Sequence, residues 1–164
     1  MKEREAPREG IELTYTGERH MTGQQGIDLS LGHIDHMIRY ASVSPFVVGK
    51  RVLDIACGSG YGSQFLALQG ADRVVGVDID HVTIEYAQRC HSHPRVTYLR
   101  ADAHAVPELE EASFDLVASF ETIEHLDAGV QEAFLHEVKR LLKPDGLLLI
   151  STPNKAVYTY AGAG

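Results

Sequence analysis

The sequence has little of what secreted or membrane-spanning proteins contain. Only two cysteines, Cys57 and Cys90, occur in 164 residues, which is too few for a disulfide framework, and neither belongs to a Cys-x-x-Cys metal motif. The strongly apolar runs are short, such as Leu147–Ile150, whereas a membrane span needs about 20 apolar residues. Met1–Glu5 is charged with no apolar stretch behind it, so we expect no signal peptide. Together these absences predict a cytoplasmic protein without a membrane segment.

Basic residues are fewer than acidic ones, so the formal net charge is -8. A protein of this balance has no broad electrostatic attraction for phosphate backbones. We therefore expect no nucleic-acid partner and a small or neutral substrate. The length and the apolar fraction of 44% fit one globular domain with one core.

The chain divides into an N-terminal segment, 1–28, without a clear period, and a domain, 29–164. The domain opens with apolar residues at helical spacing, Ile34, Met37, Ile38 and Ala41, which predict a helix that stops at Ser44-Pro45. From Lys50 onward, strand-like and helix-like segments alternate. This alternation predicts a three-layer α/β domain, with a parallel sheet between helices on both faces. We expect strands at 51–56, 73–77, 95–99, 114–120 and 147–152, and helices at 61–69, from Asp80 to about 90, and after Asp127, with loop at 103–113 and a turn at 143–146.

The most informative local pattern is a glycine-rich turn between the first expected strand and the next helix, Asp54-Ile55-Ala56-Cys57-Gly58-Ser59-Gly60-Tyr61-Gly62. Glycines there allow a ligand to approach the backbone closely. Asp78 ends the next strand and can accept hydrogen bonds from both hydroxyls of a ribose. Asp102, after the third strand, can accept from an exocyclic amine of a base. A dinucleotide site needs a third glycine where Ser63 stands, and a purely structural tight turn is the simpler alternative.

Five motifs in this order resemble those of class I S-adenosylmethionine-dependent methyltransferases. They are V-L-D-I-A-C-G-S-G-Y-G, V-V-G-V-D-I-D, R-A-D-A, F-D-L-V-A-S-F-E-T-I-E-H-L and L-L-K-P-D-G-L-L-L-I-S-T-P-N, spread from Lys50 to Asn154. The N-terminal segments G-E-R-H-M-T-G and H-I-D-H-M-I-R-Y-A are similar to those of methyltransferases of polysaccharide and O-antigen biosynthesis (methyltransferase type 11/23-like). The resemblance implies a Rossmann-like fold and methyl transfer to an oxygen of a small molecule or sugar.

The resemblance also implies roles for individual residues toward S-adenosylmethionine. Asp78 would hold the ribose and Ile79 the adenine face, while Asp102 and Ala103 would meet the adenine edge. The methionine moiety would lie against the remaining positions, with Gly58 and Gly60 facing it, Asp54 supporting the loop and the amino group, Phe120 offering backbone, and Arg39 meeting the carboxylate.

Glu121, Glu124 and His125 follow the fourth expected strand directly. If a helical turn begins there, the spacing i, i+3, i+4 brings all three to one face, where they suit a divalent cation that lowers the pKa of a substrate hydroxyl. This E-x-x-E-H pattern is similar to the metal-binding one of ubiquinone-pathway and small-RNA 2′-O-methyltransferases. The alternative is a helix-start cluster without metal. His125 is the expected catalytic base, acting directly or as a metal ligand, with Glu121 beside it.

Seven strands are usual in the family that the motifs resemble, and we expect five here, because residues 153–164 carry no strand pattern. We therefore expect the last C-terminal strands to be missing and the edge of the fifth strand to be open to a second copy, as a homo-dimer. A truncated cofactor-binding module without turnover is the second hypothesis. A nicotinamide-dependent oxidoreductase is the third, and Ser63 and the E-x-x-E-H pattern oppose it.

Overall fold

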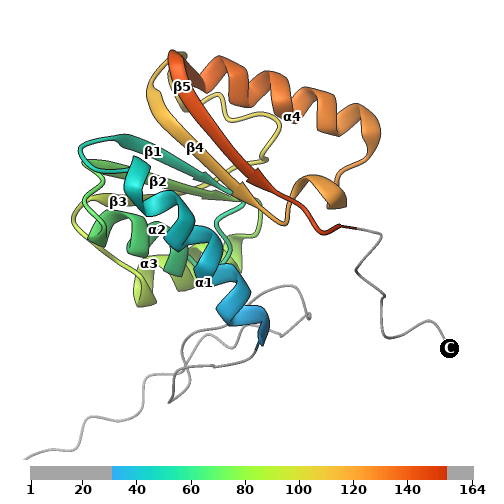
Figure 1. The fold of residues 1–164 in the computed structure, drawn as a ribbon. Coiled ribbons are helices and arrows are strands. Elements are labelled where there is room, and N and C mark those ends of the chain that lie inside the picture. Colours follow the sequence, from blue (N-terminus) through green and yellow to red (C-terminus); the bar gives the residue numbers. More distant parts are fainter. Residues whose placement is uncertain (1–30, 155–164) are drawn as a thin grey trace, which may run out of the picture.

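The computed structural model describes residues 31–154, with side chains from residue 34, and these residues contain a five-stranded sheet in the order β3-β2-β1-β4-β5. All four strand pairs are parallel. The sheet starts with β1 at its middle, and the chain then winds outward to β3 and crosses back to β4 on the other side of β1 (Figure 1). The winding therefore reverses between β1 and β4, which is where sheets of this kind open a ligand crevice at their carboxyl ends. The expected segment 1–28 lies outside the described residues.

Most element bounds agree with expectation to within a residue or two, and the expected parallel α/β sheet is confirmed. Asp80 caps α3 as predicted, since its carboxylate accepts a hydrogen bond from the backbone N–H of Val82. The strands are β1 Arg51–Ile55, β2 Arg73–Asp78, β3 Val96–Arg100, β4 Phe114–Phe120 and β5 Leu142–Ser151, and the helices are α1 Leu31–Val43, α2 Tyr61–Leu68, α3 His81–Cys90 and α4 Ala128–Leu141, with short 3₁₀ turns at Ser44–Phe46 and Ile123–His125.

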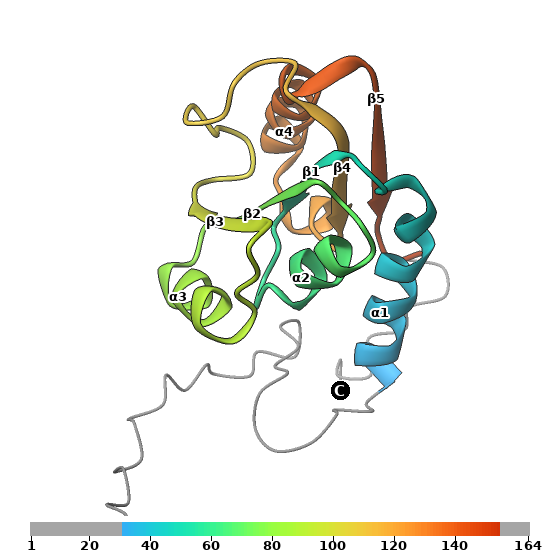
Figure 2. The ribbon, with the colours of Figure 1, turned by 90° about the vertical axis from the view of Figure 1, so that its left-hand side faces the viewer.

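Helices cover both faces of the sheet, α1, α2 and α3 on one side and α4 on the other (Figures 1 and 2). Because side chains alternate along a strand, neighbouring residues of β1 supply different cores. Val52 packs with Leu66 of α2, whereas Leu53 packs with Phe134 of α4. No helix within residues 31–154 combines the length and apolarity needed to cross a bilayer.

The apolar stripe expected in α1 is the wrong face of that helix. Ile34 and Ile38 are 39% and 57% exposed, whereas Tyr40 and Val43 are 5% and 1% exposed and join the core. The helix itself forms where the period predicts. Its orientation is decided by a polar contact with the sheet, which a count of apolar residues does not detect.

That contact is a buried hydrogen-bond cluster around Asp54, the carboxylate near the end of β1. Asp54 is 1% exposed, and it accepts hydrogen bonds from the Tyr40 hydroxyl at 3.0 Å and from the Ser63 hydroxyl at 2.6 Å. Burial raises the pKa of Asp54 to about 6, although both donors act in the opposite direction. One carboxylate thus joins α1, β1 and α2.

The start of β5 differs from expectation, because residues 143–146 form an irregularity within the strand and not a turn before it. Phe114 pairs with Leu142, but Leu116 pairs with Leu147, so the intervening residues bulge out of the ladder. In the described part of the chain β5 pairs with β4 alone, so one of its edges has no strand partner there.

Gly62 gives a direct test of how closely α1 and α2 pack. A Cβ atom built at this glycine would lie 1.9 Å from Cζ of Tyr40. We expect Gly62→Ala to lower the free energy of unfolding by about 1–3 kcal/mol, because Tyr40 must leave Asp54 or α2 must shift. Gly129→Ala in α4 is the control, since nothing lies within 4 Å of its Cβ position. Urea unfolding measures both, and equal stability of the two variants would contradict the packing.

Asp54 gives a prediction for the pH dependence of stability. A carboxyl whose pKa is higher in the folded chain than the ordinary value near 4 contributes stability below pH 4, and this contribution is lost as the pH rises through 6. Asp54→Asn removes the titration, so the stability of wild type relative to the variant should fall by about 2 kcal/mol between pH 4 and pH 7. Urea unfolding at both pH values measures the change. Asp72→Asn, on the exposed loop before β2, is the control, and its stability should change with pH as that of wild type does. If the stability of Asp54→Asn changes with pH in parallel with wild type, the assignment is wrong.

Candidate active site

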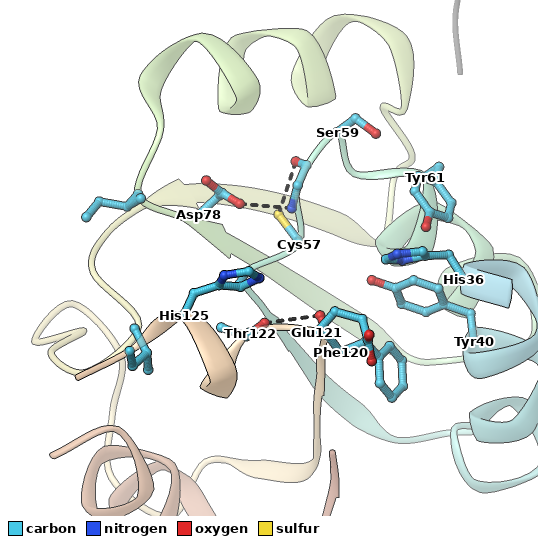
Figure 3. Close-up of a pocket in the computed structure, with 14 residues that line it drawn as sticks. His36, Tyr40, Cys57, Ser59, Tyr61, Asp78, Phe120, Glu121, Thr122 and His125 are labelled. Carbon is cyan, nitrogen blue, oxygen red and sulfur yellow. Dashed lines mark hydrogen bonds between the residues drawn. The ribbon is translucent and has the colours of Figure 1, made fainter. Parts of the chain in front are cut away.

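A cleft of about 290 Å³ opens at the carboxyl ends of β1, β2 and β4 (Figure 3). This is the position that the reversal of strand order predicts, and the volume is near the lower end for small-molecule sites. The lining residues are His36, Tyr40, Ala56, Cys57, Gly58, Ser59, Tyr61, Asp78, Ile79, Phe120, Glu121, Thr122, His125 and Leu126.

The glycines of the turn after β1 differ in what surrounds them. Gly58 has φ +55° and nothing within 4 Å of its Cβ position, so its free side faces the cleft that it lines. Gly60 has φ +86°, and a Cβ there would lie 2.6 Å from Cβ of Ala87 and 2.7 Å from the Tyr98 hydroxyl. Gly60 is not a lining residue, so the expectation that it faces a ligand is not supported. Its backbone approaches α3 and β3 instead.

Asp78 lies at the end of β2 and borders the cleft beside Ile79. Its Oδ2 accepts from the backbone N–H of Gly58 at 2.9 Å, and its Oδ1 accepts from the backbone N–H of Asp80 at 3.0 Å. Each carboxylate oxygen has a further lone pair, so Asp78 can still accept from ligand hydroxyls. Ile79 is 58% exposed and presents an apolar surface next to this carboxylate.

Asp54 and Asp102 were both expected to touch the cofactor, and neither lines the cleft. Asp54 lies beneath the glycine turn with its oxygens occupied by Tyr40 and Ser63, which agrees with a supporting role and leaves it sealed from a ligand amino group. Asp102 lies beyond β3 and pairs with the imidazole of His104. Ala103 packs against the core on the α4 side.

An aromatic wall from α1 and α2 closes the opposite side of the cleft, and sequence reasoning did not identify it. The Tyr40 ring meets Phe120 edge-on at 5.0 Å and Tyr61 at 5.6 Å. His36 lies on the same side (Figure 3). The spacing of His36, Tyr40 and Val43 places them on one face of α1 and could have indicated this wall. The apolar stripe of the neighbouring face was chosen as the buried side instead.

Glu121 extends into a small polar network at the end of β4. Its Oε1 lies 3.3 Å from Nε of Arg39 and accepts from the Ser151 hydroxyl at 2.8 Å. The side chains of Arg39 and Glu121 are 22% and 15% exposed. Arg39 is not itself a lining residue of the cleft, and it meets Glu121, which is one; its expected contact with the cofactor carboxylate stays a prediction.

The predicted metal site is not supported. Glu121 has φ +52° and lies outside the 3₁₀ turn Ile123–His125, so the spacing i, i+3, i+4 does not bring the three side chains to one helix face. Nowhere in residues 34–154 do three or more His, Cys, Asp or Glu side chains gather as a metal-ligand group. Both carboxylate oxygens of Glu124 are buried without a hydrogen-bond partner there. His125 is exposed and lines the cleft.

Two of the three non-glycine residues with positive φ in the described part of the chain line the cleft, and the third, Ala112, lies elsewhere. Ala56 and Glu121 follow the neighbouring strands β1 and β4, line the cleft, and have φ +61° and +52°. A non-glycine residue in this region costs about 1–3 kcal/mol and persists where the surrounding structure enforces it. Such outliers are typical of binding and catalytic sites.

Comparison with known proteins agrees with this geometry. A family model described as "Methyltransferase domain" matches residues 52–146. A probable S-adenosylmethionine-dependent methyltransferase of Mycobacterium tuberculosis is 34% identical over 150 residues, which cover 90% of this chain and 51% of that protein. A ubiquinone biosynthesis O-methyltransferase of Azorhizobium caulinodans is 34% identical over 82% of this chain and 51% of its own length.

Among solved structures, an S-adenosylmethionine-dependent methyltransferase from Mesorhizobium loti superposes with a TM-score of 0.65 and 26% identity, covering 75% of this chain and 55% of that one. The chain thus spans about half the length of the curated relatives that it matches. The motif order, the parallel sheet and the matched family model lead to one assignment: the chain belongs to the class I S-adenosylmethionine-dependent methyltransferases.

Proposed function

We propose that this chain binds S-adenosylmethionine in the cleft and transfers its methyl group to an oxygen of a small molecule or sugar. The observation that carries the proposal is Asp78, a carboxylate beside the open Gly58 and the exposed Ile79. Asp78 suits the ribose hydroxyls, Gly58 leaves room for the chain that leads from the ribose, and Ile79 suits the adenine face. The printed name of the Azorhizobium relative, an O-methyltransferase, supports oxygen as the acceptor atom.

The cofactor supplies an already activated methyl group, so the protein has to align the acceptor and remove its proton. Glu121 is tied to Arg39 and Ser151, which makes it a poor mobile base. His125 lines the cleft, and no hydrogen bond joins its side chain to another residue of the described chain. An imidazole placed there can accept the proton of the acceptor hydroxyl as its oxygen takes the methyl group, whose bond to the sulfonium sulfur breaks and leaves S-adenosylhomocysteine.

The nucleoside assignment predicts that Asp78→Asn weakens binding of S-adenosylhomocysteine about tenfold or more. Hydrogen bonds to a charged acceptor contribute roughly 1.5–3 kcal/mol each, and the amide replaces that charge. Calorimetry with wild type and variant measures the affinities. Asp72→Asn, the same change near the opposite end of β2, should bind like wild type. NAD offered in competition should not displace S-adenosylhomocysteine; displacement, or an unchanged affinity of a folded Asp78→Asn, would contradict the site.

Methyl transfer itself is tested with labelled S-adenosylmethionine and a panel of phenolic and sugar hydroxyl acceptors. We expect transfer to at least one acceptor, and we expect His125→Ala to lower kcat roughly 10²–10⁴-fold, the usual contribution of a general base. Affinity for S-adenosylhomocysteine should stay unchanged in that variant. His136→Ala, an exposed histidine on α4, is the control. Equal kcat for wild type and His125→Ala across the pH range would remove His125 as the base.

A further inference from the structure

Two carboxylates line the cleft, and they come from different strands. Asp78 stands at the end of β2, and Glu121 directly follows β4. Strand β1 runs between them and ends in the turn that carries Gly58. Figure 3 shows Asp78 beside this turn and Glu121 next to Phe120 and Tyr40. A ligand whose sugar is held at Asp78 and whose chain crosses β1 therefore ends at Glu121.

The carboxylate of Glu121 is held in place by contacts at one of its two oxygens. The nearest approach of Arg39 is to Oε1, and Ser151 donates its hydroxyl to the same oxygen, whereas in the described part of the chain no hydrogen bond is made to Oε2. Two anchors from different elements, α1 and β5, fix the side chain at the wall of the cleft. A carboxylate oxygen that is positioned and unshared is suited to a cationic donor.

Asp54 cannot provide this contact. Its carboxylate is 1% exposed, lies beneath the glycine turn, and is shared by Tyr40 and Ser63. Of the carboxylates at the carboxyl ends of β1, β2 and β4, Glu121 is the one that lines the cleft at the end away from the nucleoside position.

We propose that Glu121 binds the α-ammonium group of the methionine moiety of the cofactor through Oε2, the oxygen to which no hydrogen bond is made within the described part of the chain. This assignment rests on the proposed binding of S-adenosylmethionine. It gives Glu121 a binding role in place of the metal-ligand and catalytic roles expected from the sequence. Arg39 and Ser151 are then positioning residues for Glu121.

The test compares S-adenosylhomocysteine with its deaminated analogue, which keeps the nucleoside and the carboxylate but lacks the amino group. Calorimetry with wild type should show a preference for S-adenosylhomocysteine of roughly tenfold or more, the size expected for a charge-assisted hydrogen bond. In Glu121→Gln this preference should fall to near parity, because only the aminated ligand loses affinity. Glu85→Gln, which removes an exposed carboxylate of α3, should keep the wild-type preference.

The outcomes separate this assignment from the proposed function. If wild type binds neither ligand, the proposed function fails and the assignment with it. If wild type binds both and Glu121→Gln keeps the preference, or weakens both ligands equally, the assignment alone is wrong. Should the single variant not fold, Arg39→Gln/Glu121→Gln removes the ion pair as a unit. The ratio of the two affinities gives the same readout there, because both ligands carry the carboxylate that Arg39 would meet.

Discussion

The buried carboxylate of Asp54 is the interaction on which the arrangement of this cleft depends. An ionised group away from water is unfavourable unless donors satisfy it, and here the donors come from α1 and α2 through Tyr40 and Ser63. Satisfying Asp54 therefore fixes two helices relative to β1. The same contact orients α1 so that His36 and Tyr40 face the cleft and Ile38 faces solvent. The polar contact thus determines the orientation of α1, although it leaves Ile34 and Ile38 exposed.

The residues of the glycine turn follow from this cluster as much as from a ligand. Ser63 stands where a dinucleotide motif has glycine because its hydroxyl is a partner of Asp54. Gly62 is required by the Tyr40 ring, and Gly60 by the approach of Ala87 and Tyr98. Gly58 alone among the glycines of this turn faces the cleft. A glycine-rich pattern therefore reports backbone proximity, and only the structure tells whether a side chain or a ligand is the neighbour.

The strands, their order of appearance and the helix positions could be predicted, because they depend on local period and on turn residues. Asp78 and Gly58 could be placed at one edge of the sheet because Asp78 ends β2 and Gly58 belongs to the turn after β1, and parallel strands bring such ends together. The face of α1, the burial of Asp54 and the separation of Glu121 from His125 could not. The first two depend on partners about ten or more residues away in sequence, and the last on one left-handed residue, Glu121. The i, i+4 rule holds only inside a helix.

The left-handed backbone of Glu121 also explains why this carboxylate reaches Arg39. The backbone N–H of Glu121 donates to the carbonyl of Ser151, so the main chain stays in register with β5 for one residue beyond β4 while its φ turns positive. The side chain then accepts from the Ser151 hydroxyl and meets Arg39 of α1, and the next residues can enter the 3₁₀ turn that presents His125. One left-handed residue thereby places a fixed carboxylate on one side of the cleft and an exposed imidazole on the other. Ala56, directly after the adjacent strand β1, also has a positive φ and also lines the cleft.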